Sequence, residues 1–252
     1  MGKDGFDNET VLRDALANKR YSELNDNLKK TLTYISENPI DENEIIKAYK
    51  LGGLNKTDLI IEFNSTTYNL SIKKGSGNSI HQEKVEEFIL FLKDEYDISD
   101  DLKNDILYFV WGDGTLDGTG AVSDRLSAPQ FKSKYPEKIE NIKKFFHENK
   151  KELIERFLIK GKTSNSSPDY MYYGTPEEGI IVNANDALEW LSDDANEKSG
   201  TPLPIGRLTF QAWNRNINGG NKSEKKRGVI QLKWGSVGQD LKTISESRKN
   251  DK

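Results

Sequence analysis

One stretch, residues 56–87, constrains the fold most, because it reads as a β-hairpin with reactive side chains at one end. Its first apolar run is Asp58-Leu-Ile-Ile-Glu-Phe, and its second is Tyr68-Asn-Leu-Ser-Ile-Lys73. The four residues between the runs, Asn-Ser-Thr-Thr, are typical of a turn. Antiparallel pairing of the two runs would bring Asp58 and Lys73 together at one end of a sheet.

A carboxylate beside a lysine suits phosphodiester hydrolysis, which needs a divalent cation and a group that positions the attacking water. We expect Asp58 to ligate Mg²⁺ and Lys73 to position or activate the water. The usual pattern has an acid two residues before the lysine, where this chain has Ser71, and a hydroxyl is a weak ligand. A surface ion pair is the alternative interpretation of Asp58 and Lys73.

A second carboxylate must then come from elsewhere, and three glutamates are candidates. Glu9 belongs to a predicted N-terminal helix, where a favourable interaction with the helix dipole in the first turn also explains it. Glu87 lies on a predicted helix after the hairpin. Glu62 lies four residues beyond Asp58 on the same strand and the same face.

The composition leaves the chemistry to carboxylates and lysines. The 252 residues include no cysteine and two histidines, which excludes disulfides and thiolate sites and favours a reducing, cytoplasmic compartment. The sequence shows neither a transmembrane run nor a signal peptide. The net charge is −4, yet residues 201–252 hold eleven Lys/Arg and four Asp/Glu, a local +7. This asymmetry suggests a polyanionic partner, and a solvated basic tail is the alternative.

A second hairpin is predicted between residues 205 and 234, with a Gly219-Gly220 turn. A two-stranded ribbon fits the DNA major groove. We expect its exposed face to read bases, with Gln211 and Arg215 first and Arg207 and Gln231 beside them. The complete set of candidate DNA contacts is Lys74, Gln82, Arg207, Gln211, Trp213, Asn214, Arg215, Lys222, Lys225, Lys226, Arg227, Gln231 and Lys233. The alternative is the charged solvent face of an amphipathic sheet.

The remaining pattern is dominated by helices. Helices are predicted at 4–20, 22–35, 41–51, 80–93, 101–111, 135–158 (one or two helices) and 186–192, and further strands at 170–173 and 179–182. The Gly- and Asp-rich residues 111–120 predict a structured loop. A calcium loop is the alternative, but the EF-hand spacing and terminal glutamate are missing.

We expect one nuclease domain over residues 1–236, followed by a polar tail at 237–252. Within the domain, residues 1–110 would form the catalytic core, and residues 111–236 the DNA-recognition part.

Several short motifs, in order along the chain, resemble one family. They are Lys3-Asp-Gly-Phe-x-Asn-Glu9, Thr57-Asp58, Ser71-Ile-Lys73, Asp169-Tyr-Met171, Gly206-Arg-Leu-Thr-Phe-Gln211 and Ile230-Gln-Leu-Lys233. Together they resemble the PD-(D/E)xK type II restriction endonucleases, in particular the MspI-like group of small enzymes that cut four-base sites with a CG core. In this group Asn or Gln often replaces the acid at the position of Ser71.

The resemblance implies a mixed α/β fold, with a central β-sheet flanked by helices and a C-terminal hairpin. It also implies Mg²⁺ dependence, cleavage of both DNA strands at a short site, a cognate methyltransferase in the host, and a monomer or homodimer. It assigns metal ligation to Asp58 and Glu9, with Glu87 as the analogue of an acid on the following helix. A less specific defence nuclease and a non-catalytic DNA-binding module are the competing functions.

Overall fold

The computed structural model describes residues 3–250 apart from 53–54, 77, 163–165 and 213–223. The chain divides into two compact units, and the second is built from two insertions into the first. The first unit comprises residues 1–78, 155–190 and 235–252, and the second comprises 79–154 and 191–234. These boundaries differ from the predicted division at residue 110. Among the described residues, no helix is long and apolar enough to cross a membrane.

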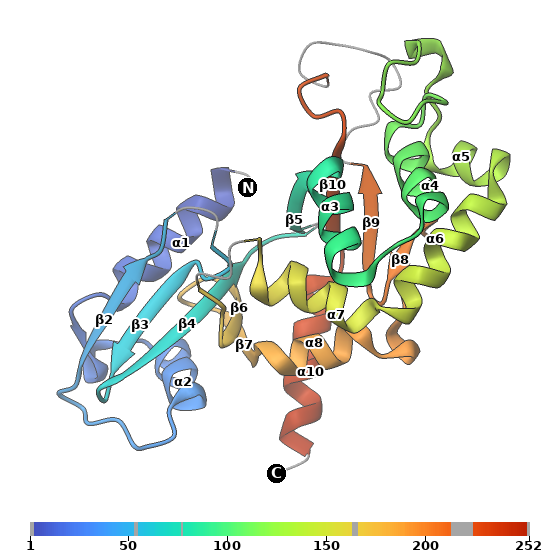
Figure 1. Cartoon of the computed structure of the whole chain (residues 1–252). Coiled ribbons are helices and arrows are strands. Elements are labelled where there is room, and N and C mark those ends of the chain that lie inside the picture. The colour runs from blue at the N-terminus through green and yellow to red at the C-terminus, as the bar shows by residue number, and fades with distance from the viewer. Residues whose placement is uncertain (1–2, 53–54, 77, 163–165, 213–223, 251–252) are drawn as a thin grey trace. The chain divides into compact units, whose positions relative to one another are not determined.

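The first unit contains a mixed six-stranded sheet in the order β1-β2-β3-β4-β6-β7 (Figure 1). Neighbouring strands run antiparallel, except for the parallel pair β4 and β6. The strands are β1 (Lys19–Arg20), β2 (Ile45–Lys50), β3 (Leu59–Phe63), β4 (Thr66–Lys73), β6 (Tyr170–Gly174) and β7 (Gly179–Asn183). The central mixed sheet flanked by helices is the predicted fold class.

Helices α1 (Lys3–Leu16), α2 (Asp26–Ile35) and α10 (Val237–Asn250) contact the strands of this sheet. The first unit also contains η1 (Tyr21–Glu23), η3 (a π-helix, Arg156–Lys160) and most of α8 (Ala184–Ser192). Leu12 and Leu16 of α1 share one buried cluster with Ile46 and Ala48 of β2. Each fully buried leucine contributes about 1.5–3 kcal/mol, so this contact fixes α1 against the strands that follow it.

The second unit contains a four-stranded sheet in the order β5-β10-β9-β8. Its strands are β5 (Asn78–Lys84), β8 (Pro204–Ile205), β9 (Leu208–Ala212) and β10 (Val229–Trp234). Its helices are α3 (Val85–Tyr96), α4 (Asp100–Trp111), η2 (Val122–Asp124), α5 (Ala128–Lys134), α6 (Pro136–Glu148), α7 (Lys150–Glu155) and η4 (Asp194–Asn196). Figure 1 shows α4 and α6 beside β8 and β9, and they contact these strands.

Phe210 of β9 is the centre of the core of the second unit. Its ring centroid lies 5.6 Å from that of Phe88, 6.1 Å from that of Phe109 and 4.9 Å from that of Phe146. All four rings are fully buried. Tilted aromatic pairs at this spacing add about 0.5–1.5 kcal/mol each to the burial of their area.

The predicted helix at 41–51 is wrong, because residues 45–50 form strand β2. Ile46 and Ala48 are buried, whereas Ile45, Lys47 and Tyr49 are exposed. This burial has a period of two, and β-branched and aromatic residues favour strands. Pairing with β3 therefore decides the conformation of the segment.

The predicted helix at 80–93 begins too early. Residues 78–84 form β5, in which His81 and Glu83 are buried and Gln82 between them is partly exposed. The helix proper is α3, from Val85 to Tyr96. The backbone N–H of Val85 donates to the carbonyl of Gly228, so strand pairing in the second unit extends to the first residue of the helix.

The expectation of a polar tail after residue 236 is also wrong. Residues 237–250 form helix α10, and its residues Val237, Leu241 and Ile244 are buried. These positions are spaced by three and four residues, as one face of a helix requires. The helix packs against β6 and β7, so the tail is a structural part of the first unit.

Candidate active site

The β3–β4 hairpin is built around a two-residue turn. Phe63 and Thr66 are paired across the strands, and Asn64 and Ser65 between them both have positive φ, of 47° and 59°. Short polar residues tolerate this left-handed region, and two-residue hairpin turns of the favoured kind need it at both positions. The turn sets the register that pairs Leu59 with Leu70. One position further, Asp58 faces Ser71.

Asp58 is 6% exposed and is held through one oxygen. Its Oδ2 accepts hydrogen bonds from the backbone N–H of Ile72 at 2.7 Å, from the Ser71 hydroxyl at 3.1 Å and from Lys73 Nζ at 3.3 Å. The backbone N–H of Asp58 donates to the carbonyl of Leu70 at 2.8 Å. No described residue donates to Oδ1, so this oxygen is available as a ligand.

Lys73 is positioned by three acceptors on its own hairpin. Nζ donates to the Ser71 hydroxyl at 2.6 Å, to the Ile72 carbonyl at 3.0 Å and to Asp58 at 3.3 Å. The Ser71 hydroxyl accepts from Lys73 and donates to Asp58, so it joins the two charged groups. Ser71 is thus a bridge between the acid and the lysine, where the usual pattern has an acid.

Glu9 of α1 is close to the same end of the sheet. Lys50 Nζ, on the last residue of β2, lies 3.1 Å from Glu9 Oε2 and donates to the Thr10 hydroxyl, also at 3.1 Å. Burial raises the pKa of Glu9, and the neighbouring Asp58 carboxylate raises it further, while Lys50 and Lys73 act in the opposite direction. The structure therefore places Glu9 within electrostatic reach of Asp58. Glu9 is the seventh residue of α1, beyond the first turn in which the helix dipole would explain it.

The other two candidate acids are placed differently. Glu62 lies four residues along β3, about 13 Å from Asp58 at the usual strand rise. Its carboxylate is 3.9 Å from Lys47 Nζ, on the paired position of β2. Glu87 is an exposed residue of α3, in the second unit. Within the first unit, Glu9 is the acid that the fold brings towards Asp58.

The donor set at this end of the sheet fits a hard divalent cation. The carboxylates of Asp58 and Glu9 are both buried, and burial first and the Asp58 charge second raise the pKa of Glu9. Carboxylate oxygens are the ligands that Mg²⁺ prefers, and a cation between two such groups would relieve their repulsion. Asp58 Oδ1 and the Glu9 carboxylate are the groups that would hold it.

The predicted base-reading hairpin contains a polar network that sequence reasoning placed in solvent. Gln231 is 2% exposed, so its position on the exposed face was wrong. Its side-chain oxygen accepts from Gln211 at 3.1 Å, and its nitrogen donates to the Ser79 hydroxyl at 2.7 Å. Gln82 donates to the same hydroxyl at 2.9 Å. Strand β5 supplies Ser79, which is why Gln231 is covered.

Arg227, a predicted phosphate contact, is largely buried in a different interaction. Its guanidinium lies 2.6 Å from the Asp113 carboxylate, and the exposed fractions of the two side chains are 8% and 0%. The same guanidinium stacks over the ring of Trp111 at 5.4 Å. The Asp113 carboxylate also accepts from the Thr115 hydroxyl at 2.7 Å. Asp113 is therefore the partner of an arginine, and residues 111–120 form a structured loop.

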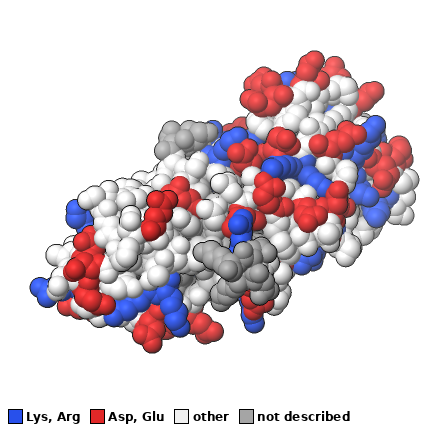
Figure 2. Space-filling view, turned by 90° about the horizontal axis from the view of Figure 1, so that it is seen from below, with Lys and Arg blue, Asp and Glu red and all other residues white. Residues whose placement is uncertain are grey.

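The remaining candidate DNA contacts fall into three groups. Lys74, Lys225 and Lys226 are exposed, and Arg207 and Lys233 are partly exposed. Trp213, Asn214, Arg215 and Lys222 lie outside the described residues. On the face shown in Figure 2, basic and acidic side chains are interspersed.

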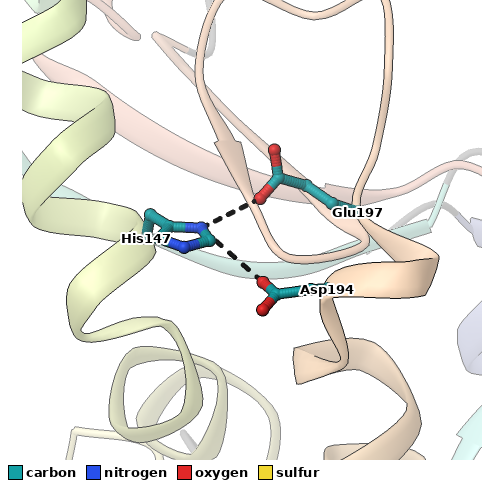
Figure 3. Close-up of side chains that lie close together, drawn as sticks. All are labelled: His147, Asp194 and Glu197. Carbon is teal, nitrogen blue, oxygen red and sulfur yellow. Dashed lines mark hydrogen bonds and ion pairs between the residues drawn. The ribbon is translucent and has the colours of Figure 1, made fainter.

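A second group of potential metal ligands lies in the second unit (Figure 3). His147 Nδ1 of α6 is 3.2 Å from Glu197 and 3.8 Å from Asp194, and the three ligand atoms lie within 4.8 Å of one another. The set is compatible with a divalent metal. All three residues are exposed. Lys150 pairs with Asp194, and this contact lowers the pKa of the Asp194 carboxyl below its usual value. We interpret this group as an ion-pair network that joins α6 to η4 and the residue after it.

Lys50 is the site residue that sequence reasoning missed. The sequence predicts a helix at 41–51, and this incorrect prediction did not place Lys50 at the end of a strand that pairs with β3. Alternation along residues 45–50 was the signal that would have found it, because a strand there places Lys50 beside Leu59, next to Asp58.

Comparisons with known proteins give a structural likeness without a matching family. No protein-family model matches the chain, and no curated protein matches it. The chain is similar to the crystal structure of the restriction endonuclease MspI in complex with its cognate DNA, at 19% identity and a TM-score of 0.40. The match covers 82% of this chain and 75% of that chain. A likeness at this level does not assign an activity, so the case for function depends on the residues around Asp58.

Proposed function

We propose that the chain is a Mg²⁺-dependent, sequence-specific endodeoxyribonuclease, a type II restriction enzyme that hydrolyses both strands of a short DNA site. One observation carries the proposal: Asp58, Ser71 and Lys73 are hydrogen-bonded together at the end of one hairpin, with Glu9 within electrostatic reach. Buried carboxylates beside a fixed lysine are the residues that phosphodiester hydrolysis requires. The motif resemblance of the sequence supports the same assignment.

Each residue has a role that follows from its contacts. Asp58 and Glu9 would hold the cation, which when bound would neutralise charge on the phosphate and make water a better nucleophile. Lys73 would orient the attacking water with the N–H that now makes its longest contact, to Asp58 at 3.3 Å, while Ser71 and the Ile72 carbonyl hold the other two. Ser71 keeps the acid and the lysine in register. In the reaction, water forms a bond to phosphorus and releases a proton to solvent, while the bond from phosphorus to one sugar oxygen breaks and that oxygen, which keeps the electron pair, takes up a proton from solvent to become a hydroxyl.

DNA binding is assigned to side chains that remain accessible. Lys74, Lys225 and Lys226 are exposed and carry the charge that phosphate contacts need. Arg207 and Gln211 are partly exposed candidates for base contacts. A cognate methyltransferase that protects the host site is part of the proposal, since an unprotected host genome would be cut.

The test is cleavage of a supercoiled plasmid with MgCl₂, with EDTA as the metal-free control. Discrete fragments support a sequence-specific enzyme, whereas a smear indicates a less specific defence nuclease. Binding of DNA without cleavage indicates a non-catalytic module. Sequencing the ends of the fragments gives the site.

A variant connects the activity to the proposed residues. Lys73→Ala removes the group that orients water, and we expect at least a hundredfold loss of cleavage rate, because one electrostatic group of this kind contributes about 10²–10³-fold. Lys47→Ala is the matched control, because Lys47 lies on the neighbouring part of the same sheet, is 57% exposed and pairs with Glu62. If Lys73→Ala cuts as fast as the wild type, the proposed active site is wrong.

A further inference from the structure

The proposed site contains a second lysine whose contacts differ from those of Lys73. Lys73 is bonded to acceptors on its own hairpin, all within β4 or beside it. Lys50 instead reaches from the last residue of β2 to two residues of α1, the Glu9 carboxylate and the Thr10 hydroxyl. The Lys50 and Glu9 side chains are 16% and 8% exposed. Lys50 therefore links the helix to the sheet at the proposed metal site.

The charges of this group are balanced without a metal. Asp58 is paired with Lys73 at 3.3 Å, and Glu9 is paired with Lys50 at 3.1 Å. Two carboxylates and two ammonium groups sum to zero. Leaving a buried carboxylate charged and without a partner is costly, so Glu9 needs a proton or a cation beside it when the divalent ion is absent, and Lys50 at 3.1 Å supplies the cation.

We propose that Lys50 is a resident counter-ion for Glu9, which occupies the carboxylate in the metal-free protein and is displaced from it when a divalent cation binds. The inference rests on the proposed function, since it takes Glu9 as a metal ligand. Lys50 is in this sense a positioning residue. It keeps Glu9 and the middle of α1 against the sheet, at the cost of competing with the cation for the same carboxylate.

The competition predicts an unusual effect of removing the lysine charge. In Lys50→Met without bound metal, the Glu9 carboxylate no longer has the Lys50 ammonium beside it. The metal-free variant is therefore less stable than the metal-free wild type. The cation no longer has to displace an ammonium group or to bind beside its positive charge. We therefore expect Mg²⁺ and Mn²⁺ to bind about tenfold or more tightly to the variant, and to raise its melting temperature by more than they raise that of the wild type.

The experiment measures melting temperature against MgCl₂ and MnCl₂ concentration, with Mn²⁺ titration calorimetry for affinity. Lys50→Arg keeps the charge and is expected to behave as the wild type, while Lys50→Gln keeps a polar group without charge and is a second test if the methionine variant does not fold. Lys47→Met is the matched control, because Lys47 lies on the same strand but is 57% exposed and pairs with Glu62. Lys50→Met combined with Glu9→Gln should show no gain in affinity.

The outcomes separate this inference from the proposed function. If the wild type cleaves DNA and is stabilised by Mn²⁺, but Lys50→Met binds Mn²⁺ equally or less tightly, the counter-ion role is overturned and the nuclease stands. If the wild type neither cleaves nor binds Mn²⁺, the proposed function fails. A larger metal-induced stabilisation in Lys50→Met and Lys50→Gln, absent in Lys50→Arg and Lys47→Met, supports the inference.

Discussion

At the scale of single residues, Asp58 has the arrangement that the proposed function needs in a metal ligand. Its Oδ2 is fixed by the backbone of Ile72 and by two side chains, while no described residue donates to Oδ1. A carboxylate held on one side only presents the other to a ligand without further rearrangement. Its burial strengthens electrostatic interactions, because the local dielectric is lower than that of water.

The identity of the second carboxylate is the first prediction at this scale. Glu9→Gln keeps the size of the side chain and removes its charge, and we expect at least a hundredfold loss of Mg²⁺-dependent cleavage with weaker Mn²⁺ binding. Glu87→Gln, in the second unit, should change the rate by about twofold or less. Cleavage rates and Mn²⁺ titrations of both variants decide the question. Full activity in Glu9→Gln, or its loss in Glu87→Gln, would reverse the assignment.

The site residues that could be predicted from the sequence are those that lie close to one another along the chain. Asp58 and Lys73 are joined by one short turn, so their meeting follows from strand periodicity and turn residues alone. The Glu9 placement needed a resemblance, because nothing local relates a helix residue to a strand 49 positions later. Lys50 was not predicted, because alternation over six residues was read as a helical stripe. The exposed position predicted for Gln231 is wrong because Ser79, its partner, belongs to strand β5, whereas the sequence predicts no strand there and a helix from residue 80.

At the scale of elements, ion pairs with at least one buried partner hold the loops around Trp111. Asp113 and Arg227 are buried as a pair, and the buried Arg125 of the same unit lies 2.8 Å from Glu224, which is exposed. Gly118 and Gly228 both approach the Trp111 ring so closely that a Cβ atom would lie within 2.5 Å of it. The loop after α4 and the start of β10 are thus fixed around one tryptophan.

Breaking the Asp113–Arg227 pair gives the second prediction. Arg227→Met leaves a buried carboxylate without its partner, and we expect a loss of about 3–5 kcal/mol in the free energy of unfolding. Lys226→Met, at the preceding and exposed position, should cost less than about 1 kcal/mol. Urea unfolding measures both. A double-mutant cycle with Asp113→Asn should show strong coupling, and additive effects would mean that the two residues act independently.

Tyr172 of β6 gives a prediction on alkaline stability. Burial raises its pKa from 10.0 to about 12. Its hydroxyl donates to the Thr175 carbonyl at 2.5 Å and accepts from Asn27 at 3.0 Å. Between pH 10 and pH 12 the unfolded chain loses a proton that the folded chain keeps, so stability falls with rising pH, by up to about 3 kcal/mol.

Unfolding free energies between pH 9 and pH 12 check this expectation. Tyr172→Phe removes the ionising group, and the variant should lose less stability over this range than the wild type does, although it begins less stable because two hydrogen bonds are gone. An equal slope in both proteins would show that other groups control the alkaline transition.

The elements themselves were predictable where local pattern and tertiary contact agree. The β3–β4 hairpin, α2, α4, α6, β6, β7 and the β9–β10 strands were expected from periodicity and caps, and they are present. The incorrect predictions concern segments whose conformation is determined by contact with another element. Residues 45–50 are a strand because β3 pairs with them, and residues 237–250 are a stable helix because β6 and β7 receive its apolar face.

At the scale of the whole molecule, each unit closes its own core. One buried cluster gathers α1, α2 and the strands of the first sheet, and the rings around Phe210 fill the second unit. The candidate catalytic residues Glu9, Asp58, Ser71 and Lys73 all belong to the first unit, and the C-terminal hairpin belongs to the second. Catalysis and DNA recognition are thus assigned to different units under the proposed function.

Because each unit has its own core, we expect a core substitution in one unit to destabilise mainly that unit. Phe210→Ala removes the ring at the centre of the second core, and we expect a local loss of about 3–5 kcal/mol. Hydrogen exchange followed by mass spectrometry should show reduced protection in peptides from residues 79–154, with smaller changes in residues 56–73. Equal loss of protection in both segments would show that the two units open as one cooperative structure.

The parallel pairing of β4 with β6 has a consequence for how the chain folds. The hairpin of β3 and β4 forms from residues close in sequence, whereas Leu70 finds its partner Tyr170 only after 100 further residues. Closing a loop of that length costs roughly 4 kcal/mol of chain entropy. Before β6 pairs with it, β4, which carries Ser71 and Lys73, is an open edge of the sheet. An open edge can pair with strands of other chains. Pairing with β6 therefore removes an edge at which the incompletely folded chain could aggregate.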